Sequence, residues 1–172
     1  MDIKEAKTMG GVGAILTLLG FVPKVGWILS IVGFVLLYLA IKKISEAVNK
    51  SEILSDFIKA IVLSIVSVVV LFLGGGATFM GIFTYIGGGR PHLFGLAFIL
   101  FLIGWIIAII ASYFYYQALT KTGEATGVNN FKIAGLLMFI GYILLIIVVG
   151  SIVVLIGEIF EIISFFSLPD TI

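Results

Sequence analysis

Residues 131–168 read FKIAGLLMFIGYILLIIVVGSIVVLIGEIFEIISFFSL, an apolar run of 38 residues. A helix needs about 20 apolar residues to cross a bilayer, so this run is too long for a single crossing. The helix is most easily interrupted at Gly150-Ser151, and we therefore predict two arms, residues 131–149 and 151–168. A single bent helix followed by an interfacial segment is the alternative.

The composition of the whole chain requires lipid as its solvent. Of 172 residues, 62% are hydrophobic and 11% are charged, and the mean hydropathy is +1.32. A soluble domain carries about 25% charged residues, so this chain has too few polar groups to cover its outside. The net charge of +1 argues against nucleic acid as a partner. With no cysteine and one histidine, disulfides and Cys- or His-based metal sites are excluded, and no cofactor is expected.

The apolar runs predict an all-α fold, a polytopic transmembrane helical bundle of about six membrane segments in one domain, residues 1–172. Runs 10–22 and 26–41 flank a Pro-Lys break and predict an N-terminal helical hairpin. Its first arm is short, so it either crosses a thin part of the bilayer or enters the bilayer only in part. In run 57–86 we expect the membrane helix to end near Leu73, before Gly74-Gly75-Gly76, and the rest of the run to be irregular or a separate helix.

Three further expectations complete the chain. Residues 87–92, GGGRPH, are expected to form a turn before the next segment, residues 93–119. Residues 42–59 are expected to extend the second helix into water, and Ser55 and Asp56 are expected to cap the following helix.

The distribution of basic residues predicts the orientation. If the N-terminus is cytoplasmic, eight basic residues lie inside, while Lys24 and Arg90 lie outside. Cytoplasmic loops carry the excess of lysine and arginine, so we predict a multi-pass protein of the cell membrane with a cytoplasmic N-terminus.

The chain contains an internal repeat. The segment GWILSIVGFVLLYLAIKKISEAV, from Gly26, matches GWIIAIIASYFYYQALTKTGEAT, from Gly104, at nine of 23 positions. We predict two parallel halves, roughly residues 26–86 and 104–168. Aromatic residues at the ends of membrane helices are typical interfacial anchors, and those predicted here are Trp27, Trp105, Tyr113, Tyr115 and Tyr116.

Glycine is abundant, with 21 copies, and small residues let membrane helices approach closely. The predicted helix-packing residues are Gly10, Gly13, Gly20, Gly26, Ser30 and Gly33. The contacts they make are expected either within the chain or with a neighbouring copy, and the sequence leaves both open.

Glu158 and Glu161 are the candidate site. Residues three apart share a helix face, so if residues 151–168 cross the bilayer, both carboxyl groups lie near its middle. Ionisable groups there cost on the order of 3 kcal/mol each and usually face a bundle interior or water. A protonatable pair of this kind would suit a proton or cation site. If the segment is interfacial, both face water or headgroups.

Three stretches carry a resemblance to a known family: GGVGAILTLLGFVPKVGWILSIVGFVLLYLAIKKIS, TKTGEATGVNNFKIAGLL and FFSLP. They resemble the uncharacterised prokaryotic integral-membrane family catalogued as domain of unknown function 996. The resemblance implies a small polytopic membrane protein, and it implies no activity or catalytic residue.

Three functions compete. A membrane enzyme ranks last, because no Ser-His-Asp set, HExxH motif or Walker loop is present, and two non-enzymatic functions rank above it. The first is a structural, scaffolding or assembly component packed through its glycine-rich helices, as a homo-oligomer or in a larger membrane complex. The alternative is a small channel or transporter for protons or cations that uses Glu158 and Glu161.

Overall fold

The computed structural model describes residues 3–86, 91–147 and 149–171, and within them the chain forms six α-helices. The all-α class expected from the sequence is confirmed. The helices are α1 (Lys4–Leu18), α2 (Gly26–Ala47), α3 (Ser51–Ile86), α4 (Pro91–Thr126), α5 (Asn130–Ile143) and α6 (Val149–Phe166). Two 3-10 turns, η1 (Leu19–Phe21) and η2 (Leu144–Ile146), end the first and fifth helices. Among the described helices, α2, α3, α4 and α6 are long and apolar enough to cross a membrane.

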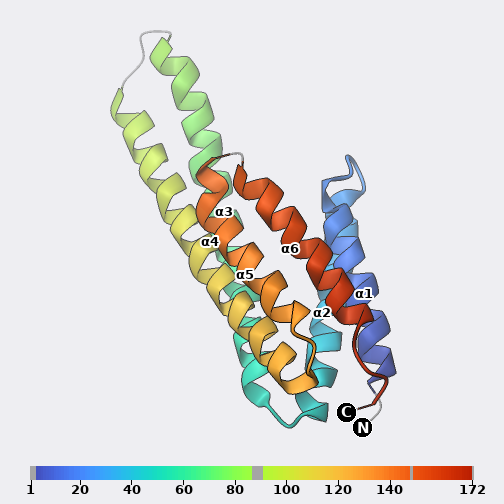
Figure 1. Ribbon diagram of the computed structural model, residues 1–172. Helices are drawn as coiled ribbons and strands as arrows, with labels where there is room; N and C mark the ends of the chain where they lie inside the picture. Colours follow the sequence, from blue (N-terminus) through green and yellow to red (C-terminus); the bar gives the residue numbers. More distant parts are fainter. Residues whose placement is uncertain (1–2, 87–90, 148, 172) are drawn as a thin grey trace.

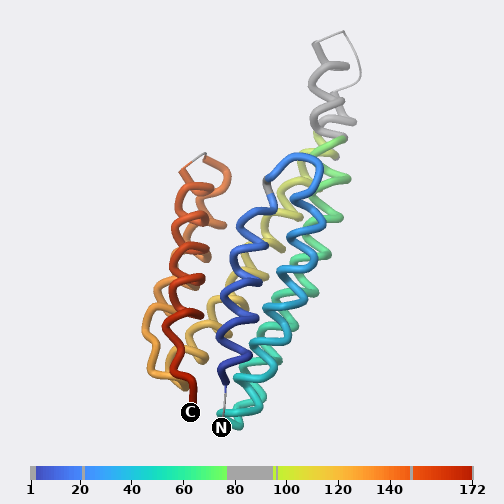
Figure 2. The backbone as a smooth tube through the Cα atoms, turned by 90° about the vertical axis from the view of Figure 1, so that its right-hand side faces the viewer, coloured from blue at the N-terminus to red at the C-terminus, as the bar shows by residue number. Residues whose placement is uncertain are grey.

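The helices form three antiparallel hairpins, α1–α2, α3–α4 and α5–α6 (Figure 1). Each helix packs against the next one along the chain, and α6 packs against α1, so the six close into a ring. Both chain ends lie at the same end of the bundle (Figure 2). There the backbone N–H of Ile3 donates a hydrogen bond to the carbonyl of Asp170 over 3.0 Å.

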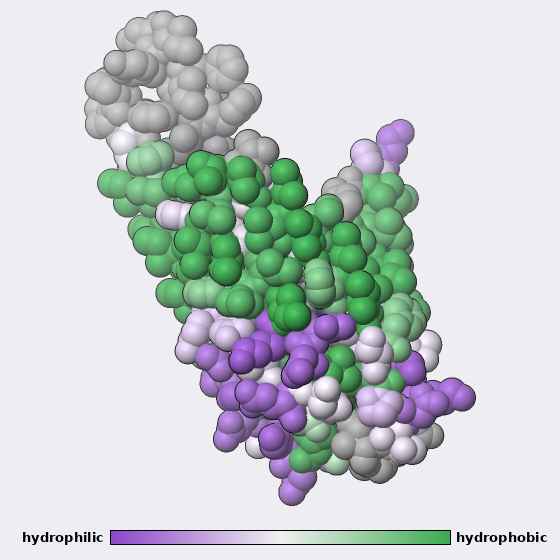
Figure 3. All heavy atoms as spheres, viewed as in Figure 1, coloured by the Kyte–Doolittle hydropathy of each residue, from purple (hydrophilic) through white to green (hydrophobic). Residues whose placement is uncertain are grey.

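Charge is concentrated at the end of the bundle that carries the termini, which we call the charged end. Figure 3 shows hydrophilic side chains there and a broad apolar surface over the middle of the helices. The helix directions place the eight lysines at 4, 7, 42, 43, 50, 59, 121 and 132 at this end, whereas Lys24 lies in the turn between η1 and α2 at the opposite end. This distribution follows the separation expected for a helical membrane protein.

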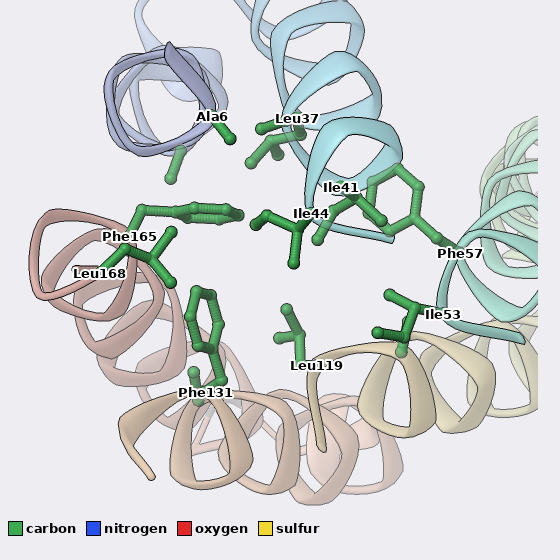
Figure 4. Close-up of a cluster of buried hydrophobic side chains, with 14 of the residues drawn as sticks. Ala6, Leu37, Ile41, Ile44, Ile53, Phe57, Leu119, Phe131, Phe165 and Leu168 are labelled. Carbon is green, nitrogen blue, oxygen red and sulfur yellow. The ribbon is translucent and has the colours of Figure 1, made fainter. Parts of the chain in front are cut away.

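Just inside the charged end, buried apolar side chains from all six helices meet in one core cluster (Figure 4). Phe165 of α6 lies edge-on against Phe131 of α5, with ring centroids 5.0 Å apart. Ile44 of α2, Phe57 of α3 and Leu119 of α4 complete the centre, and all are fully buried. The ring of helices is therefore filled by side chains at this level.

Glycines make the close approaches within the hairpins. A Cβ atom on Gly13 of α1 would lie 2.8 Å from the carbonyl oxygen of Gly33 in α2, and one on Gly33 would lie 2.7 Å from the carbonyl oxygen of Gly13. In α3–α4, a Cβ on Gly104 would lie 3.0 Å from the backbone nitrogen of Leu71. In α5–α6, a Cβ on Gly157 would lie 3.0 Å from the backbone nitrogen of Met138. These backbones touch because no side chain intervenes.

The expected interruption of the helix near Leu73 is wrong. Helix α3 continues through Gly74-Gly75-Gly76 to Ile86. In an apolar environment no water competes for backbone hydrogen bonds, so glycine does not break a helix there as it does in water. The expected turn at 87–92 falls partly outside the described residues, which resume at Pro91, the first residue of α4.

The two predicted arms of residues 131–168 are present as α5 and α6, but the break lies at residues 144–147 and not at Gly150-Ser151. Ile147 is extended (φ −116°, ψ 143°) and ends η2. Gly150 belongs to α6, and its N–H donates to the carbonyl of Ile147 over 2.9 Å. Its lack of a side chain lets α6 start against Leu144, so the glycine marks the turn from inside the next helix.

Two other boundaries differ from expectation. Helix α1 begins at Lys4, six residues before the apolar run. Helix α3 begins at Ser51, so neither Ser55 nor Asp56 caps it, and Asp56 has another role. Its buried carboxylate instead pairs with Lys121 of α4 at 2.7 Å and with Lys59 at 3.0 Å, joining α3 to α4 at the charged end.

The two repeat segments run in the same direction along α2 and α4, and the duplication itself stays a prediction.

Replacing Gly33 by alanine is expected to lower the thermal stability of the protein in detergent. The new methyl group would press on the backbone of α1, and overpacking of this kind typically costs about 1–3 kcal/mol. The matched control is Gly75→Ala in α3, where a Cβ meets nothing within 4 Å. That change should be neutral or stabilising because alanine is the better helix former. Equal melting temperatures for both variants would contradict the close α1–α2 approach.

Single cysteines at Ser151 and Thr171 should be labelled from opposite sides of sealed vesicles by an impermeant maleimide. Ser151 lies at the start of α6 and Thr171 follows its end at Phe166, and the helix rises about 23 Å from Ser151 to Phe166. The chain has no cysteine of its own, so each site reports without background. Labelling of both from one side would mean that α6 does not cross the membrane.

Candidate functional site

Helix α6 turns one face into the bundle, and Glu161 lies on it. The buried residues of this helix are Gly150, Gly157, Glu161, Ser164 and Phe165. Glu161 is only 2% exposed, while Glu158, one turn closer to the start of the helix, is half-buried. Along the helix axis, Glu158 lies about 13 Å from the start of α6 and Glu161 lies about 18 Å from it. Both carboxyl groups therefore lie well inside α6, and their place in the middle of a bilayer stays a prediction.

Glu161 is held by a tyrosine from another helix. The hydroxyl of Tyr115 in α4 donates a hydrogen bond to Oε1 of Glu161 over 2.5 Å. The ring of Tyr115 lies against Phe57 of α3, with centroids 5.5 Å apart, so packing fixes its direction. The second oxygen of Glu161 has no hydrogen-bond partner among the described residues, and Glu161 lines a cavity.

This cavity has a volume of about 190 Å³ and receives side chains from all six helices. Its polar lining consists of hydroxyl groups, one indole and the two carboxyl groups, and the rest is apolar. The polar and aromatic lining residues are Thr17, Ser64, Ser67, Ser112, Phe34, Trp105, Tyr115, Tyr142, Glu158 and Glu161. The site is thus a property of the whole bundle and not of α6 alone.

A second hollow shares Tyr142, Leu145, Val154 and Glu158 with the cavity. It continues along α6 to Ser151, near the end opposite the charged end. Glu158 therefore lies where the two hollows meet. Together they follow α6 from Glu161 to Ser151, about 15 Å of helix rise.

Toward the charged end the cavity is bounded by the core cluster. Leu37 belongs both to the cavity wall and to the cluster. Leu119 follows Tyr115 by one helical turn, and Phe165 follows Glu161 by one turn, so the fully buried side chains lie directly beyond the acid. The site is closed by apolar packing on this side.

No lysine, arginine or histidine lines either hollow among the residues that the structure describes. A buried charge without a partner is strongly disfavoured, so the carboxyl groups are suited to hold a proton or a bound cation. The same residues contain no group of three or more His, Cys, Asp or Glu side chains that could hold a metal ion.

The predicted interfacial anchors fall into two groups. Trp27 is 65% exposed at the start of α2 and Tyr113 is 43% exposed on α4, in keeping with a lipid-facing position. Trp105 instead lines the cavity, and its indole N–H donates to the carbonyl of Tyr142 over 3.0 Å. Tyr116 stacks on Phe139 of α5. Their role as membrane anchors stays a prediction.

Sequence reasoning missed that Tyr115 belongs to the acid site. It was expected at the interface, yet its hydroxyl points to Glu161. A signal was present: residues 113–116 are four consecutive aromatics, and helical residues are about 100° apart, so four in a row cannot all face lipid. The roles of Ser67 and Tyr142 in the cavity wall had no such signal.

The predicted helix-packing residues meet partners within the chain. Gly10 lies against Phe165 of α6, Gly20 lies against Ser30 and Gly26, and Gly13 lies against Gly33. These contacts belong to the α1–α2 hairpin and to its seam with α6.

Comparison with known proteins gives a family and a relative. The profile of the family described as "Protein of unknown function (DUF996)" matches residues 29–159. The uncharacterized protein MJ1644 of Methanocaldococcus jannaschii is 41% identical over 175 residues, which cover 99% of this chain and 95% of that protein. No solved structure matches the chain significantly.

Replacing Tyr115 by phenylalanine should destabilise the protein more than replacing Tyr113. The first change leaves the buried Glu161 without its donor, and losing one partner of a buried hydrogen bond costs about 1–3 kcal/mol. Tyr113 is exposed, and its hydroxyl accepts a hydrogen bond from Gln117 at the surface, so Tyr113→Phe is the matched control. Thermal unfolding in detergent measures both. Equal stability of the two variants would contradict the buried pair.

Proposed function

The chain belongs to the DUF996 family of proteins of unknown function, and because the family supplies no activity, we propose from the geometry that this membrane protein moves protons or small cations through Glu158 and Glu161. The observation that carries the proposal is Glu161, which is 2% exposed and lines a cavity without a positively charged side chain among the described residues.

The electrostatics of the cavity support a cationic solute. A carboxyl group at membrane depth is costly, and such groups usually mark ion pathways or proton relays. Here two of them face one cavity from successive turns of α6. An anion would meet like charge and no basic side chain, so only a proton or another cation complements this lining.

Because the two hollows adjoin each other, they support a pathway along α6 over an isolated pocket. Glu158 borders both, and Glu161 lies one turn deeper beside the core cluster. A proton or cation that enters beside Ser151 would meet Glu158 first and Glu161 second. In the orientation that the lysines favour, the charged end is cytoplasmic and the hollows lead toward the outside.

Scaffolding is the second candidate, and the lengths of α3 and α4 favour it. Each has 36 residues and rises about 54 Å, while the hydrocarbon core of a bilayer is about 30 Å thick. A hairpin longer than the membrane could bind a partner beyond it. In contrast, the glycine contacts of α1 and α2 lie within the chain, so they offer less support for oligomerisation.

Purified protein in liposomes should dissipate imposed cation gradients. The assay applies gradients of protons, of potassium and of a small organic cation in turn, each followed by a trapped indicator or a labelled ion. Glu158→Gln/Glu161→Gln should slow the flux about tenfold or more, equivalent to at least about 1.4 kcal/mol. Glu124→Gln, an exposed carboxyl at the charged end, should leave the flux unchanged.

Two results would count against the proposal. Flux that is unaffected by both substitutions would remove Glu158 and Glu161 from the pathway. The absence of flux under every gradient would reject transport and leave scaffolding as the better account.

A further inference from the structure

We propose that the ligand of the cavity is a small organic cation, an ammonium ion with apolar substituents, bound between the carboxyl pair and the aromatic wall. This inference rests on the proposed function, because it names the class of cation that the same site takes. It is carried by three features of the lining: its charge, its hydrogen-bond donors and its aromatic side chains.

The lining offers hydrogen-bond acceptors, and most of its donors are already used. Thr17, Ser67 and Ser112 donate to the backbone carbonyls of Ala14, Gly104 and Ile109 at 2.8, 2.9 and 2.8 Å. Tyr115 donates to Glu161, and Trp105 donates to the carbonyl of Tyr142. Among the described lining residues, the hydroxyls of Ser64 and Tyr142 remain as neutral donors. A ligand that is itself positive, and that needs few donors from the protein, fits this pattern.

The lining does not suit a hard metal ion. Calcium takes about 6–8 oxygen ligands, and magnesium demands about six in a regular octahedron. The described residues supply two carboxyl groups, and one oxygen of Glu161 already accepts from Tyr115. No third acidic, histidine or cysteine side chain joins them within the described chain. Such an ion would keep most of its water inside a largely apolar cavity.

The aromatic and aliphatic wall supplies what an organic cation needs. Phe34, Trp105, Tyr115 and Tyr142 line the same cavity as the two carboxyl groups. A cation over an aromatic face gains about 0.5–2 kcal/mol, most over tryptophan and most when water is excluded. The apolar substituents of the ligand gain further from burial against Leu37, which lies at the closed end of the cavity.

The aromatic wall is preorganised by contacts between the helices. The hydrogen bond from Trp105 to the carbonyl of Tyr142 fixes the indole of α4 to the end of α5. Packing on Phe57 fixes the ring of Tyr115. Because these side chains are already placed, binding need not order them, which lowers the entropic cost of binding.

The test uses Trp105 as the reporter. The chain has two tryptophans, and Trp27 is 65% exposed on the outside of α2. In the variant Trp27→Phe, Trp105 is therefore the single tryptophan and the source of the signal. We expect tetraethylammonium to change the fluorescence of this protein saturably, while sodium and magnesium chloride at the same ionic strength do not. Isothermal titration calorimetry on the native protein gives a reading that does not depend on Trp105.

Matched variants locate the binding. Glu158→Gln/Glu161→Gln should abolish the tetraethylammonium signal, and Glu124→Gln should retain it. Tyr142→Leu should weaken binding about tenfold, or about 1.4 kcal/mol, whereas Phe72→Leu, 81% exposed on α3, should not. The single variant Glu158→Gln, at the half-buried acid, should weaken binding by itself and serves if the double variant does not fold.

The outcomes separate this inference from the proposed function. Saturable binding of sodium or magnesium without binding of tetraethylammonium would overturn the ligand class while cation flux through Glu158 and Glu161 would still stand. Tetraethylammonium binding that survives the double substitution, or that ignores Tyr142→Leu, would place the ligand elsewhere and overturn the inference. If no ion binds and no gradient drives flux, both proposals fail.

Discussion

The packing of Phe165 closes the ring of helices, and the position of the acid site depends on it. Its ring meets Phe131 of α5 at 88° and lies against α1 where Gly10 leaves room. Glu161 precedes Phe165 by four residues and therefore lies on the same face of α6. Burying this phenylalanine fixes the rotation of the helix and brings the carboxyl group inward with it. The cost of placing an acid there, on the order of 3 kcal/mol, is offset by the core packing of α6 and by the hydroxyl of Tyr115.

Each hairpin is closed by backbone contact at glycine, and this explains why the bundle is hollow in one half. Between membrane helices the hydrophobic effect supplies no attraction, so helices associate where their surfaces touch closely. Gly13 with Gly33, Gly104 with Leu71, and Gly157 with Met138 provide this contact inside the three hairpins. The hairpins are joined to each other by short links at the charged end, residues 48–50 and 127–129. Tight pairs that converge at one end leave room between them farther along, where the cavity lies.

The features that the sequence predicts well are those set by solvent and by local sequence. Lipid requires apolar helices, so the all-α class, the N-terminal hairpin and the two arms of residues 131–168 could be predicted. The break at Gly74-Gly75-Gly76 was wrong because rules for glycine come from helices in water. The inward rotation of Tyr115 and the shared cavity wall could not be predicted, since they depend on which helices become neighbours. The pairing of Asp56 with Lys121 crosses 65 residues and has no local signal.

If the site moves cations as we propose, the closed end of the cavity favours a carrier over an open channel. With the core cluster in place, a cation beside Glu161 has no polar route to the charged end through the residues that the structure describes. Transport through this site therefore requires the helices to separate there. The seam between α1 and α6 is suited to that movement, because Phe165 and Phe166 lie against glycines and Lys7 pairs with Asp170 in an exposed ion pair. Exposed ion pairs contribute about 0–1 kcal/mol, so the apolar contacts of Phe165 supply most of the resistance to opening. The residue that sets the direction of Glu161 would then also control when its site opens to the charged end.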